Sequence, residues 1–113
     1  MNKIGEILDV YKSVCREFDI NQLHSYIVKN SIIIMSWGFN RPSIIIPSKC
    51  YRFSVRGNHH KGYVYIVLNF MDTFTIYYTN THNVIKKISN DVYIFDILRI
   101  LDEDIEKVPE YNF

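Results

Sequence analysis

The sequence predicts an α+β domain: one or two N-terminal helices, an antiparallel meander of about five strands, and a C-terminal helix. Three observations predict this class. Apolar residues recur at steps of three and four near both ends of the chain, which is the spacing of amphipathic helices. Between them lie short segments in which apolar and polar residues alternate, as in strands with one buried face. Gly, Asn and Pro residues separate those segments and indicate turns.

The length of 113 residues predicts a single compact domain over residues 1–113. The hydrophobic share of 48% is enough for one core without a structural metal or a disulfide. We therefore expect Cys15 and Cys50 to be reduced and buried. The N-terminus lacks the apolar run of a signal peptide, and no apolar stretch is long enough to span a bilayer. We expect a cytoplasmic protein without a membrane partner.

The first part of the chain predicts two helices and then a change to strands. An apolar stripe with helical spacing runs from Ile4 to Phe18. Asp19 can cap a second, short helix from about Ile20 to Val28, because its side chain can accept N–H groups of the first turn. Residues 31–38, S-I-I-I-M-S-W-G, predict a buried strand because they are rich in β-branched side chains.

A turn and a short strand follow. The segment from Trp37 to Pro42 is predicted to be a turn because it holds Gly, Asn and Pro. Residues 43–47, S-I-I-I-P, then predict a second short strand that Pro47 closes.

The next two strands form the most regular part of the pattern. Residues 50–56 alternate between apolar and polar, and residues 57–58 suit a two-residue hairpin turn that pairs Arg56 with His59. Opposed residues of a hairpin share a face. The predicted apolar face comprises Tyr51, Phe53, Val55, Val64, Ile66 and Leu68. The predicted polar face comprises Arg52, Arg56, His59, Lys61, Tyr63 and Tyr65.

The last strands and the final helix complete the predicted fold. A loop of odd length, such as residues 69–73, keeps Phe74 and Ile76 on the apolar face, because a one-residue slip would reverse every side chain. Residues 80–83 predict another turn, and residues 84–88, V-I-K-K-I, a short edge strand whose lysines discourage edge pairing. Asn90 or Asp91 can cap the C-terminal helix. Its apolar stripe comprises Ile94, Ile97, Leu98, Leu101 and Ile105.

Charge is unevenly distributed along the chain. The net charge is +6 over residues 37–90 and −5 over residues 91–113, although the whole chain carries only +1. A basic middle and an acidic end can attract each other in the folded protein, or they can face different partners. The sequence leaves both alternatives open.

The polar face of the predicted sheet is a candidate nucleic-acid interface, because tyrosines stack on bases while arginines and lysines bind phosphates. The candidate residues are Arg52, Arg56, His59, Lys61, Tyr63, Tyr65 and Tyr77. Residues 61–68, K-G-Y-V-Y-I-V-L, partly resemble the aromatic strand of RNA-recognition domains. Val64 and Leu68 depart from that pattern, and so does the order of elements. The alternative is that helices cover this face and the tyrosines are half-buried.

A second set of residues is a candidate protein interface. Trp37 and Phe39 can form a knob for a partner, or they can fill the core beneath a turn. The acidic residues after residue 101 can contact a basic partner, or they can form a solvated face. The helix dipole disfavours acidic side chains at the C-terminal end of a helix, where these residues lie. The candidate residues are Trp37, Phe39, Asp102, Glu103, Asp104, Glu106 and Tyr111.

The sequence shows no motif for catalysis, a cofactor or a metal. There is no nucleophile with an adjacent base, no Gly-rich phosphate loop and no Cys or carboxylate at ligand spacing. The adjacent His59 and His60 would point to opposite faces of a strand, so they are not expected to share a metal ion. We expect a non-enzymatic protein without a cofactor, and the sequence leaves its oligomeric state open.

Three segments, S-W-G-F-N-R-P, C-Y-R-F-S-V-R and H-K-G-Y-V-Y-I-V-L-N, resemble a pattern in small uncharacterised proteins of bacterial phages and mobile elements. The resemblance covers roughly residues 35–101 and supplies no active residue. It implies a small accessory protein, such as one that acts on a host or defence component. The leading prediction is a binding module for an unidentified protein partner. The alternative is a module that binds RNA or DNA.

Overall fold

The computed structural model describes six ranges of the chain and confirms the α+β class in them. The described residues are 4–5, 17–29, 37–46, 49–57, 60–68 and 73–105. The strands are β1 (Asn40–Ile46), β2 (Cys50–Arg56), β3 (Lys61–Leu68), β4 (Phe74–Thr79) and β5 (Ile85–Val92). Helix α2 (Ile20–Val28) precedes them, and the single turn η1 (Ile94–Asp96) and helix α4 (Ile97–Ile105) follow. No helix in these ranges is long and apolar enough to cross a membrane.

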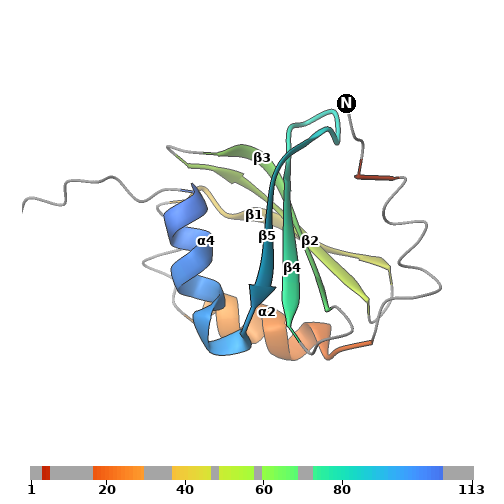
Figure 1. The fold of residues 1–113 in the computed structure, drawn as a ribbon, viewed down its shortest axis with the longest axis vertical. Helices are drawn as coiled ribbons and strands as arrows, with labels where there is room; N and C mark the ends of the chain where they lie inside the picture. The colour runs from red at the N-terminus through yellow and green to blue at the C-terminus, as the bar shows by residue number, and fades with distance from the viewer. Residues whose placement is uncertain are drawn as a thin grey trace, which may run out of the picture.

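The five strands form one antiparallel meander in the order β1-β2-β3-β4-β5 (Figure 1). In a meander, successive turns lie at alternate ends of the sheet. The β2–β3 and β4–β5 turns therefore share one end. The first residue of β1, Asn40, lies at that same end because it pairs with Ser54 near the end of β2.

One face of the sheet packs on both helices and forms the main core. Its members from the sheet are Tyr51, Phe53, Val55, Val64, Ile66, Phe74, Ile76 and Tyr78, with Val92 at the end of β5. Both helices contribute one buried residue from each successive turn: Ile20, Leu23 and Ile27 from α2, and Ile97, Leu101 and Ile105 from α4. Each such apolar side chain stabilises the fold by roughly 1.5–3 kcal/mol when it is fully buried. The predicted apolar face of the meander is confirmed.

The predicted two-residue turn between β2 and β3 is wrong. Arg56 pairs with Lys61, so the turn spans four residues, and Gly57 N–H donates to the His60 carbonyl at 2.9 Å. A Cβ on Gly57 would lie 2.1 Å from the carbonyl oxygen of Ile105, so this glycine is needed where the hairpin meets the end of α4. The register shift is two residues, and every paired side chain of β2 and β3 keeps its predicted face.

The predicted turn from Trp37 to Pro42 is shorter than expected, because β1 already begins at Asn40. Arg41 has a φ of 54°, and the pairing with β2 shifts between Asn40 and Ser43, which marks a bulge. Pro42 is tolerated there because β1 is an edge strand, where a missing N–H breaks no ladder.

Several predicted boundaries are confirmed. Asp19 caps α2, and its Oδ1 accepts the Gln22 N–H at 3.0 Å. Leu68 pairs with Phe74, which leaves the five-residue loop that the apolar pattern requires. The predicted edge strand exists as β5, although it extends to Val92.

The start of the C-terminal helix differs from the prediction. Asn90 and Asp91 belong to β5, and Tyr93 occupies the cap position of η1 without a side-chain hydrogen bond. The η1 turn leaves Ile94 41% exposed, so it does not join the buried stripe. The predicted helix from Ile4 to Phe18 and the predicted strand over residues 31–38 lie largely outside the described residues, as does Cys15.

Candidate anion-binding site

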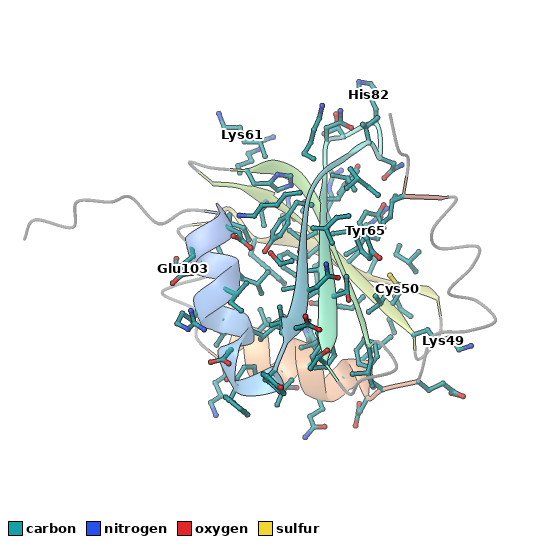
Figure 2. The ribbon with its side chains drawn as sticks, in the orientation of Figure 1. Lys49, Cys50, Lys61, Tyr65, His82 and Glu103 are labelled. Atoms are coloured by element: carbon teal, nitrogen blue, oxygen red, sulfur yellow. The ribbon has the colours of Figure 1, made fainter. Side chains whose placement is uncertain are left out.

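A hollow of about 730 Å³ lies at the end of the sheet that the β2–β3 and β4–β5 turns share. Its walls come from the chain before and at the start of β1, the end of β2, the start of β3 and the β4–β5 turn. Figure 2 shows Lys61 and His82 at this upper end of the sheet and Lys49 at the lower end. The meander brings these distant segments together, because it returns every second turn to the same end.

The charged residues that line this hollow are all cations: Arg41, Arg56 and Lys61. All three are exposed, and no acidic residue lines the hollow. The salt bridges among the described residues lie on β5, η1 and α4, and none involves these three side chains. Like charges gathered without a counter-charge create a positive potential that attracts anions. We call this site the basic hollow.

Uncharged polar groups also line the basic hollow. Asn80 Oδ1 accepts the N–H groups of His82 and Val84 at 2.9 and 3.0 Å, which fixes the amide in the β4–β5 turn. The Asn80 Nδ2 group can then donate to a ligand. Gly62 has a φ of 142°, and a Cβ there would lie 2.1 Å from the Thr79 carbonyl oxygen, so β3 approaches β4 closely at this point.

Tyr63 is the aromatic residue among those that line the basic hollow, and it is half-buried. The Arg52 guanidinium carbon lies 4.7 Å from the Tyr63 ring centroid and 5.9 Å from that of Tyr65. The two tyrosine rings meet edge to face at 6.4 Å. Arg52 Nε is buried and has no hydrogen-bond partner among the described residues. Arg52 is therefore packed on aromatic rings and does not line the hollow.

The prediction that Tyr65 and Tyr77 form a stacking surface is wrong, because their exposed fractions are only 2% and 6%. Both rings belong to a second apolar cluster on this face, which also holds Ile4 and Cys50. Tyr65 donates to Asn83 Oδ1 at 2.6 Å, and burial raises its pKa although Arg52 opposes the shift. Ile4, which is helical in the structure, contributes to the cover of these rings.

The sequence predicted His59 on the polar face of the sheet and His60 on the opposite face. His59 lies outside the described residues. His60 Nε2 lies 3.2 Å from the Tyr63 carbonyl oxygen, and its ring meets the Tyr78 ring edge to face at 5.2 Å. Burial lowers the pKa of His60, although its contacts with the backbone of Tyr63 and Thr79 and the Asp104 charge oppose that shift. His60 thus supports the hairpin from within.

Of the described residues that were predicted as a protein interface, most are buried or half-buried. Trp37 is fully buried, and its Nε1–H donates to Asp102 Oδ1 at 3.0 Å, so the indole is not available as an anchor. Phe39 is half-buried and packs on Phe53 with ring centroids 4.8 Å apart. Glu106 and Tyr111 lie outside the described residues.

Asp104 is the acceptor at the centre of a network between α4, β4 and β5. It accepts hydrogen bonds from Tyr78 at 2.7 Å and from Ser89 at 2.9 Å, and it pairs with Lys87. Burial and the nearby Asp104 charge raise the pKa of Tyr78 far above its ordinary value. The predicted acidic face is therefore wrong for Asp102 and Asp104. Among the described acidic candidates, Glu103 is the exposed one, and it pairs with Arg99 at 3.4 Å.

The sequence pattern missed an exposed apolar group between β5 and α4. Tyr93, Ile94 and Phe95 are 52%, 41% and 72% exposed. The Tyr93 and Phe95 rings are parallel within 9°, with centroids 5.8 Å apart. Helical periodicity had assigned Ile94 to the buried stripe, and η1 breaks that periodicity.

The pattern also missed the contribution of Arg41 and Asn80 to the basic hollow. The sequence did contain information on this site. The predicted order of strands, with its turns correctly placed, puts Arg56, Lys61 and Asn80 at the same end of the sheet. Within the described ranges, no group of three His, Cys, Asp or Glu side chains is placed to hold a metal ion. Comparison with family models, curated proteins and solved structures found no match to this chain.

Proposed function

We propose that the chain is a nucleic-acid-binding module, without catalytic activity, that holds phosphates in the basic hollow. The observation that carries this proposal is the gathering of Arg41, Arg56 and Lys61 around a cavity that no acidic residue lines. Arginine matches phosphate oxygens with paired donors, and lysine adds a point charge. Asparagine and backbone N–H groups are further common phosphate donors, and Asn80 supplies such an amide.

The size of the cavity supports a nucleotide-sized ligand. A volume of about 730 Å³ falls within the range of roughly 300–1,000 Å³ that is typical of small-molecule sites. A segment of a longer strand can therefore enter, while the rest of the strand passes over the surface. The sequence favoured protein binding over nucleic-acid binding, and the proposal reverses that order. The reason is that Trp37, Asp102 and Asp104, which were predicted to contact a protein, have internal partners.

The test is a fluorescence-anisotropy titration of the full chain with labelled RNA and DNA oligonucleotides at two salt concentrations. Three neutralised phosphates of a single strand predict a slope of about −2 for log K against log salt, so affinity falls about 20-fold between roughly 50 and 200 mM salt. Absence of binding at the lower salt concentration would contradict the proposal.

The matched control compares two lysines that receive the same substitution. Lys61→Glu lies in the basic hollow, whereas Lys29→Glu changes an exposed lysine at the end of α2. We expect Lys61→Glu to weaken binding strongly and to reduce the salt slope by about 1, because one phosphate contact is lost. Lys29→Glu should bind as the parent protein does. Equal weakening by both would show a general charge effect and not a site.

A second candidate function is protein binding through the exposed group of Tyr93, Ile94 and Phe95. The observation that favours it is the 72% exposure of Phe95 beside a parallel Tyr93 ring, because aromatic anchors dominate many protein interfaces. A phage or mobile-element accessory protein, as the resemblance implies, could use either surface. Capture of a partner from lysate of the source cells should be lost in Phe95→Ser. Unchanged capture by that variant would remove this candidate.

A further inference from the structure

We infer that the basic hollow takes an unpaired nucleotide, with its base against Tyr63 and its phosphates among Arg41, Arg56 and Lys61, so that single strands bind more tightly than duplexes. This inference rests on the proposed function and adds the class of nucleic acid to it. It depends on the position of one aromatic ring inside a cavity whose charges are all positive.

Tyr63 and Lys61 leave the start of β3 on the same face, because they are two residues apart on one strand. Both line the basic hollow, so a ring and a cation lie within reach of one ligand. A nucleotide presents that combination, since its base has a flat π-surface and its phosphate is charged. Stacking of a base on an aromatic side chain contributes about 1–3 kcal/mol and depends little on which base it is.

The Tyr63 ring is preorganised by contacts within the protein. The Arg52 guanidinium packs on it at 4.7 Å, and Tyr65 meets it edge to face. Tyr65 is itself buried and hydrogen-bonded to Asn83, so this support is fixed. A ring that is already ordered loses little conformational entropy on binding, which favours affinity. Arg52 is thus a positioning residue for Tyr63.

A duplex cannot use this ring in the same way. The bases of a duplex are stacked on both sides, and proteins read them by inserting a helix or a two-stranded ribbon into a groove. Tyr63 instead lines a cavity, so a base must leave the stack to reach it. Base flipping costs a few kcal/mol, which is comparable to the gain from stacking. The duplex is therefore left with its phosphate contacts alone.

The experiment compares three labelled ligands of equal length at one salt concentration: an oligothymidine strand, the same strand with abasic sites throughout, and a duplex. We expect oligothymidine to bind roughly 5- to 140-fold more tightly than the abasic strand, which corresponds to the stacking of one base. Tyr63→Leu should abolish this difference and leave affinity for the abasic strand and the salt slope unchanged. Tyr63→Phe keeps the ring and should keep the difference, and far-UV circular dichroism checks that both variants fold.

The outcomes separate this inference from the proposed function. Equal affinity for oligothymidine and the abasic strand, or for oligothymidine and the duplex, would overturn the inference, while the loss of binding in Lys61→Glu would still support the proposed function. No binding of any ligand would overturn both. Thymidine 5′-monophosphate serves as a competitor. If it competes at the same concentration as oligothymidine, the hollow is a site for free nucleotides and the preference for single strands is wrong.

Discussion

The acidic run on α4 and the basic residues Arg56 and Lys61 of the hollow were both predicted from the sequence as exposed charges that contact a partner. In the folded protein, the two sets of charges have different partners. Asp102 and Asp104 accept hydrogen bonds from buried donors of the core, whereas Arg41, Arg56 and Lys61 form none of the salt bridges among the described residues. Charges that have internal partners stabilise the fold. Charges that lack them are available to a ligand.

The largest expected effect is a loss of stability when an internal hydrogen-bond acceptor is removed. Asp104→Ala removes the acceptor for Tyr78 and Ser89 and the partner of Lys87. Buried donors without an acceptor are costly, so we expect the free energy of unfolding to fall by about 3 kcal/mol. Urea denaturation measures this change. The neighbouring Glu103→Ala is the control, and its loss should stay below about 1 kcal/mol because an exposed ion pair contributes little. Similar losses of unfolding free energy in both variants would contradict the distinction between acids with internal partners and exposed acids.

The next effect should appear in binding and not in stability. The double variant Arg41→Glu with Arg56→Glu should lower nucleic-acid affinity by at least about 10-fold, because two phosphate contacts become repulsive. Its free energy of unfolding should stay within about 0.5 kcal/mol of the parent value, because both side chains are exposed. Anisotropy and urea denaturation on the same preparation separate the two quantities. A large loss of stability would mean that these arginines have a structural role.

A smaller effect is expected at Arg52, whose guanidinium packs on the Tyr63 ring. Arg52→Met removes the cation from the Tyr63 ring but keeps a side chain of similar length. We expect the preference for oligothymidine over the abasic strand to decrease while the salt slope stays the same. A decrease of the slope by about 1 would show that Arg52 contacts a phosphate directly, and its assignment as a positioning residue would be wrong.

The smallest effect concerns pH and the hairpin. Burial lowers the pKa of His60, so the unfolded chain binds a proton that the folded chain excludes. Stability should therefore fall as the pH drops from about 7 through the ordinary histidine pKa of about 6.5 and on toward the lowered folded value. His60→Gln should show a weaker fall when urea denaturation is compared at about pH 7 and about pH 5.5. An identical pH dependence in both proteins would show that His60 does not contribute.

The faces of the meander could be predicted from the sequence because side chains alternate with a period of two. The turn at residues 57–60 was predicted two residues too short, yet Tyr51, Phe53 and Val64 remain on the core face, since an even shift preserves the alternation. The cap at Asp19 could be predicted for a similar reason. Capping depends on a side chain and N–H groups within three residues.

The candidate site was harder to predict because it depends on contacts between distant segments. The polar face from Arg52 to Tyr77 was expected to bind along its length. Tyr65 and Tyr77 are instead covered near Ile4, and only the end of this face, at Arg56, Lys61 and Tyr63, lines a cavity. The helical pattern identified acids at 102–104 but not the donors that they meet. Those donors come from Trp37, β4 and β5, and their positions follow from tertiary packing.

The close contact between Gly57 and Ile105 has a further consequence for how this protein can evolve. Any side chain at residue 57 would collide with the backbone of the last turn of α4, so the hairpin and the helix must move together. Mutational drift at this position would shift Arg56 and Lys61 along with a core helix. Under the proposed function, a lineage that changed its ligand would be expected to vary exposed positions such as Arg41 first, while residue 57 stayed a glycine.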